Sequence, residues 1–88
     1  MIKGTTKSGF EYQISDEALN DYEVFEALCE LDGGRTTKLP MLLSLLLGEN
    51  QAKTLKEHLR QKNGRVPLTA MVDEIQDILS GSEQGKNL

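Results

Sequence analysis

The middle of the chain carries a stretch that is apolar on almost every side. Residues 39–47 hold seven large apolar side chains, and only Pro40 and Ser44 interrupt them. Pro40 suits the first turn of a helix and Gly48 suits its end, so we expect a short helix over residues 41–47. Since a helix in a small domain normally buries one stripe, this helix must either lie at the centre of the fold or contact another chain.

The N-terminal residues have the pattern of a β-hairpin. Phe10, Tyr12 and Ile14 alternate with polar residues at the period of a strand, and the polar residues 5–9 separate them from a second short run. Two strands alone are marginally stable, so the face that carries these three side chains should be buried against helices. A short helical turn is expected after Ser15.

A second helix is expected to begin at an Asn20 cap and to end at Gly33 and Gly34. Its broad apolar stripe comprises Tyr22, Phe25, Leu28 and Cys29, flanked by Val24 and Leu31. Further along, Glu49 or Asn50 opens a helix that runs to about Lys62. After the turn signal Asn63-Gly64, Pro67 starts the clearest helix of the chain. Its apolar stripe comprises Leu68, Met71, Val72, Ile75, Ile78 and Leu79.

The predicted fold is therefore mainly α (α+β), with an N-terminal β-hairpin packed on a compact bundle of about four short helices. Residues 1–80 are expected to form a single globular domain. Ser80, Gly81 and Ser82 are expected to end the last helix, which leaves residues 81–88 as a flexible C-terminal tail.

Charge and composition narrow the function classes. The net charge is -4, and residues 11–32 contain eight acids and no Lys or Arg, so binding to nucleic acid is disfavoured. Single Cys and His residues, Cys29 and His58, leave no cluster for a metal, and we expect Cys29 to be buried and His58 to be solvated. No apolar run approaches a membrane span. We expect no catalytic residues, no cofactor and no membrane partner.

Two alternative functions stay open at this point. The acidic residues 11–32 would suit an adaptor or inhibitor that binds a basic protein surface. Residues 41–62 also have the outline of a helix-turn-helix with Lys53, Lys56, Arg60 and Lys62 on its second helix, although the overall charge opposes binding to DNA.

The order of four segments resembles the small tail assembly chaperones of long, non-contractile-tailed phages and prophages. The segments are DYEVFEALCEL at residues 21–31, LPMLLSLLLG at residues 39–48, LKEHLR at residues 55–60 and GRVP at residues 64–67. The resemblance spans about residues 9–80. It implies a non-catalytic chaperone that binds and solubilises the tape measure protein during tail morphogenesis.

The same resemblance implies further properties. Such a chaperone would self-associate, would have the tail tube protein as a further partner, and would act in the host bacterial cytoplasm without entering the mature virion. As anchors for the client we predict Met41, Leu42, Leu45 and Leu46 in the apolar segment. Tyr22 and Phe25 are predicted as either core residues or secondary anchors.

Overall fold

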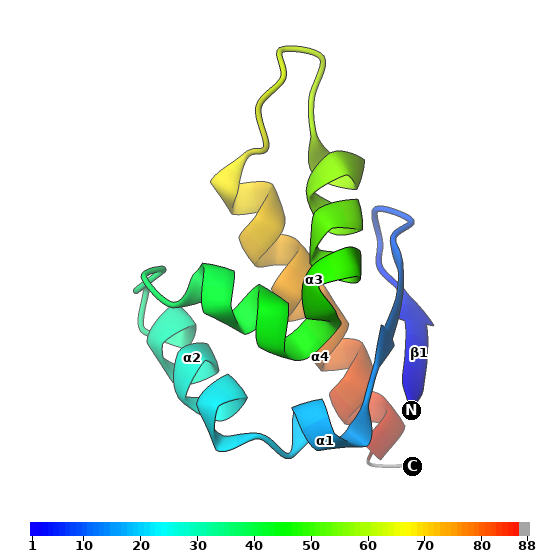
Figure 1. The fold of residues 1–88 in the computed structure, drawn as a ribbon, viewed down its shortest axis with the longest axis vertical. Coiled ribbons are helices and arrows are strands. Elements are labelled where there is room, and N and C mark those ends of the chain that lie inside the picture. The colour runs from blue at the N-terminus through cyan, green and yellow to red at the C-terminus, as the bar shows by residue number, and fades with distance from the viewer. Residues whose placement is uncertain (87–88) are drawn as a thin grey trace.

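Two short strands and four helices make up the part of the chain that the computed structural model describes, which is the backbone of residues 1–86 and the side chains of residues 1–80. In chain order the elements are β1 (Ile2–Thr5), β2 (Glu11–Ile14), α1 (Asp16–Leu19), α2 (Tyr22–Asp32), α3 (Leu39–Leu59) and α4 (Leu68–Lys86). The predicted fold class is confirmed: an N-terminal hairpin lies against a group of helices (Figure 1).

The hairpin is antiparallel and pairs Ile2 with Ile14. The inward side chains of β2 and the turn, Phe10, Tyr12 and Ile14, are buried as the alternation predicts. Gly4 lies opposite Tyr12, and a Cβ atom at Gly4 would overlap the tyrosine ring. Gln51 of α3 covers the other edge of β2, because its side-chain amide accepts from the Gln13 N–H at 2.7 Å and donates to the Gln13 carbonyl at 2.7 Å.

Helix α3 is broken at Gly48. The backbone there has φ 80° and ψ 164°, a conformation that residues with a Cβ atom rarely adopt. The two halves of α3 consequently run in different directions (Figure 1). This confirms the predicted interruption between the apolar segment and the next helix, although the second half ends at Leu59 and not at Lys62.

The first half of α3 is central to the core. Leu42 is 0% exposed and Leu46 is 2% exposed, while Met41 and Leu45 are half-buried against the same cluster. Helix α2 packs on α3 from one side, and β2, α1 and α4 also contact α3. Central burial, rather than contact with another chain, therefore accounts for the apolar character of residues 39–47.

Helix α2 buries a different face from the one predicted. Val24, Ala27 and Leu31 point into the core, whereas Tyr22 and Phe25 are exposed. The expected N-cap is also wrong by one residue, since the capping side chain is that of Asp21, whose Oδ1 accepts from the Glu23 N–H at 2.8 Å.

Helix α4 packs against β1 and α3 through Met71, Ile75 and Ile78. Its predicted end at residues 80–82 is wrong, because the helix continues to Lys86. A single glycine such as Gly81 costs a helix about 1 kcal/mol without ending it. Of the predicted tail, residues 87 and 88 lie outside the described residues. Within residues 1–86, none of the helices combines the length and apolar character needed to cross a bilayer.

Candidate functional site

Four polar side chains from distant parts of the chain meet beside the hairpin turn. The hydroxyls of Thr6 and Ser8 donate to Oε1 of Glu74 at 2.8 and 2.9 Å. Nε2 of His58 lies 3.1 Å from Oγ of Ser8 and 3.1 Å from the Ser8 carbonyl oxygen. A serine, a histidine and a carboxyl group are therefore close together, as they are in a catalytic triad. Whether they could act as one depends on which atoms donate the hydrogen bonds.

The directions of the hydrogen bonds in this cluster do not suit a nucleophilic serine. Ser8 has a single hydroxyl proton, and Glu74 accepts it, so the contact with His58 requires the imidazole to donate from Nε2. A general base would have to accept at that nitrogen, and the carboxyl group would have to orient the imidazole rather than the serine. The arrangement therefore positions the turn and does not activate Ser8.

The same contacts fasten the hairpin turn to two helices. The Lys7 N–H donates to Oδ2 of Asp77 at 2.7 Å, and the Phe10 N–H donates to Oγ1 of Thr6 at 3.1 Å. The ring of Phe10 lies 5.9 Å from that of His58. His58 is exposed, as expected, but it is engaged with the turn rather than only with solvent.

A shallow groove between α2 and α4 is lined by several apolar side chains. Phe25, Leu28 and Cys29 line it from α2, and Gln76 and Leu79 line it from α4, around about 510 Å³ of space. The remaining lining residues are Leu31, Asp32 and Ser80. No Lys or Arg lines this groove, and Asp32 places an acidic group at its edge.

Phe25 belongs to the lining of this groove, and the exposed ring of Tyr22 lies beside that of Phe25. Tyr22 is 69% exposed and Phe25 is 61% exposed, and their ring centroids are 6.4 Å apart. Large exposed aromatic side chains are unusual when they occur together, and they are typical of protein contact sites. Cys29 lies on the same helix and is exposed, so the prediction that it is buried is wrong.

Two acids of α2, Glu26 and Glu30, are already paired with Lys38. Nζ of Lys38 lies 2.8 Å from Oε1 of Glu26 and 2.9 Å from Oε2 of Glu30. Lys38 thereby lowers the pKa of the Glu26 carboxyl group, and the two carboxylates raise the pKa of Lys38. Arg35 adds a longer ion pair with Glu30 at 3.7 Å. These contacts neutralise part of the negative charge of residues 11–32.

The predicted anchors fall into three groups. Leu42 and Leu46 are core residues, so the structure removes them from any surface that a partner could contact. Met41 and Leu45 are half-buried and pack on the core. Tyr22 and Phe25 are exposed and adjacent. The sequence analysis missed Gln76 and Leu79 as the opposite wall of the groove, although Leu79 at the edge of the α4 stripe was a usable signal.

Comparisons with known proteins leave the family of this chain open. No family model matches it, and neither a curated protein nor a solved structure matches it. Among the described residues, no group of three or more His, Cys, Asp or Glu side chains could hold a metal ion.

Proposed function

We propose that this protein is a non-catalytic tail assembly chaperone that binds and solubilises the tape measure protein of a long, non-contractile-tailed phage or prophage. The observation that carries the proposal is the exposed pair Tyr22 and Phe25 at the groove between α2 and α4. An amphipathic helix of the client would lay its apolar stripe into this groove, which is a common mode of helix recognition. The resemblance noted in the sequence supplies the identity of the client.

The groove suits repeated, reversible binding. It is open and shallow, with Phe25 in its lining and the exposed ring of Tyr22 next to Phe25, and it is not an enclosed pocket. A long helical client would present many similar stripes, so weak contacts by many copies would add up to firm coverage. We therefore propose that several copies coat one client in the host bacterial cytoplasm, with self-association and contact with the tail tube protein, and leave before the virion matures.

The test is co-expression of this chain with the tape measure protein of the same genome, scored by solubility and co-purification at high salt. Apolar contacts tolerate salt, so the wild-type chain should keep the client soluble under these conditions. Y22D/F25D should abolish co-purification. The variant removes two aromatic side chains that the bound client would bury, which weakens the binding of each chaperone copy by about 3 kcal/mol, or roughly 100-fold.

The matched control is S44D/T54D, which adds the same charge at two exposed positions outside the groove. It should behave like the wild type, and both variants should keep a helical circular dichroism spectrum. A client that stays insoluble with the folded wild-type chain contradicts the proposed function. A client that stays soluble with folded Y22D/F25D contradicts the groove as its site. Binding that disappears with salt favours the acidic adaptor instead.

A further inference from the structure

The connection between α3 and α4 projects from the helices at one end of the molecule (Figure 1). Residues 60–65 are exposed, Val66 and Pro67 are partly buried, and only Val66 of this connection packs against the core. We call residues 60–68 the tip. Connections between helices are commonly mobile, whereas several hydrogen bonds join residues within the tip.

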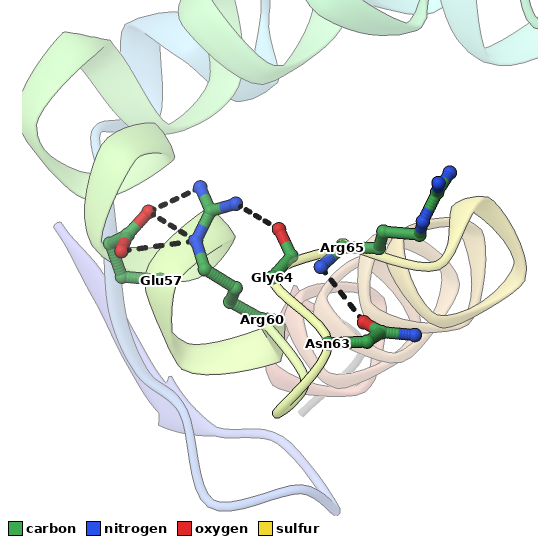
Figure 2. Close-up of polar contacts among 5 residues, drawn as sticks. All are labelled: Glu57, Arg60, Asn63, Gly64 and Arg65. Carbon is green, nitrogen blue, oxygen red and sulfur yellow. Dashed lines mark hydrogen bonds and ion pairs between the residues drawn. The ribbon is translucent and has the colours of Figure 1, made fainter.

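Backbone hydrogen bonds close the tip on itself. The Gln61 N–H donates to the Arg65 carbonyl at 2.9 Å, and the Gly64 N–H donates to the Gln61 carbonyl at 2.9 Å. Oδ1 of Asn63 accepts from the Arg65 N–H at 2.9 Å (Figure 2). Gly64 has φ 85°, which favours glycine at this turn. The tip is therefore pre-organised before any partner arrives.

The side chain of Arg60 forms hydrogen bonds within this part of the chain. Its guanidinium donates to both carboxylate oxygens of Glu57, with Nη2 2.6 Å from Oε2, and Nη1 donates to the Gly64 carbonyl at 2.7 Å (Figure 2). Nε of Arg60 also lies 3.2 Å from Oε1 of Glu57. These bonds lower the pKa of the Glu57 carboxyl group and hold the tip against the end of α3. The charge of Arg60 is thus balanced.

The positive charges of Lys62 and Arg65 have no such acidic partner among the described residues. Neither side chain forms an ion pair or hydrogen bond with another residue that the structure describes, and the Arg65 side chain points away from the contacts drawn in Figure 2. Three residues after Arg65, Leu68 at the start of α4 is 57% exposed. The tip thus presents two uncompensated cations and one apolar side chain on an ordered support. This combination is suited to a partner that supplies carboxylates around an apolar side chain.

We propose that the tip is a docking surface for an acidic segment of another protein. Lys62 and Arg65 would contact its carboxylates, and Leu68 would contact an apolar side chain between them. The surface is separate from the groove between α2 and α4, whose lining shares no residue with the tip. It therefore stands whether or not the groove holds a tape measure protein.

Several observations favour a protein over a nucleic acid as the occupant. The chain has a net charge of -4, and Glu57 lies next to the tip. Binding to a phosphate backbone depends on many cations, whereas the tip offers two that are free. The tip also has no aromatic side chain on which a base could stack, while Leu68 provides an apolar contact that suits a peptide.

The probe is a fluorescently labelled glutamate-rich peptide with a central leucine, titrated with the full chain at low ionic strength and followed by anisotropy. K62E/R65E should weaken binding roughly 10- to 30-fold, because two attractions are lost and two repulsions are gained. L68Q should weaken it several-fold. K3E/K53E is the matched control, since it makes the same change of charge at two exposed positions outside the tip, and it should retain binding close to that of the wild type.

Three results would overturn the proposal. Equal weakening by K3E/K53E would show that only the overall charge matters. Tighter binding of a single-stranded oligonucleotide than of the peptide, lost in K62E/R65E, would identify a nucleic-acid surface. Peptide binding unchanged by K62E/R65E, with altered sedimentation of the chain alone, would show that the tip contacts a second copy instead. Circular dichroism of each variant confirms that it is folded.

Discussion

Replacement of Gly48 by alanine isolates the contribution of one backbone conformation to stability. At φ 80° and ψ 164° a residue with a Cβ atom is strained by about 1–3 kcal/mol. No neighbouring atom lies within 4 Å of the position that the new Cβ would occupy, so the cost comes from the backbone and not from a clash. Alanine also lowers the conformational entropy of the unfolded chain, and this effect offsets about 0.4–1 kcal/mol of the strain.

The midpoints of these two ranges give for G48A a net loss of about 1.3 kcal/mol in the free energy of unfolding, or roughly 5–10 °C in Tm for a chain of this size. Urea unfolding followed by circular dichroism measures the loss. G33A is the matched control, because Gly33 has φ -82° and ψ 7° and its Cβ would make ordinary contacts at 3.6 Å. G33A should be neutral or stabilising by up to about 1 kcal/mol.

An equal loss in G48A and G33A would refute this reasoning. So would a gain of stability in G48A together with a stronger helical signal, since that result would mean that the two halves of α3 prefer to join as one straight helix.

Two further predictions concern polar contacts. T6V should destabilise the fold by about 1–3 kcal/mol in urea unfolding, because it leaves the Phe10 N–H and Glu74 without their buried partner, whereas S8A at an exposed residue should cost less. An unchanged midpoint for T6V would show that the cluster adds nothing. K38M should return the pKa of Glu26 to its ordinary range, as measured by carboxyl NMR titration. Because Lys38 lowers that pKa, the pair stabilises the fold above the ordinary carboxyl pKa, and this contribution is lost as the pH falls through the lowered value. A Glu26 titration that is identical in K38M would contradict the ion pair.

The elements of this fold could be predicted where a single local rule applies. The alternation of Phe10, Tyr12 and Ile14 predicts both the hairpin and its buried face. Gly48 predicts the interruption of α3, because no other residue adopts its conformation so readily.

The candidate site could be predicted only in part, because α2 carries two apolar stripes. Tyr22 and Phe25 form one, and Val24, Ala27 and Leu31 form the other. Periodicity cannot decide which stripe packs on α3, since that depends on the shape of the facing helix. The contacts of Thr6 and Ser8 with Glu74 join residues far apart in sequence, and no local pattern indicates them.

The fastening of the hairpin turn has a consequence for how the chain folds during synthesis. Ser8 bonds to a residue 66 positions later, and Lys7 bonds to one 70 positions later. While the ribosome is still adding α4, the hairpin turn therefore has no such partner, and β1 lacks the helix that packs against it. Closure of such long loops is slow compared with the formation of helices. The hairpin is synthesised before α4 but should complete its docking only after residues 74–77 have emerged, so that it is among the last parts of this fold to be held in place.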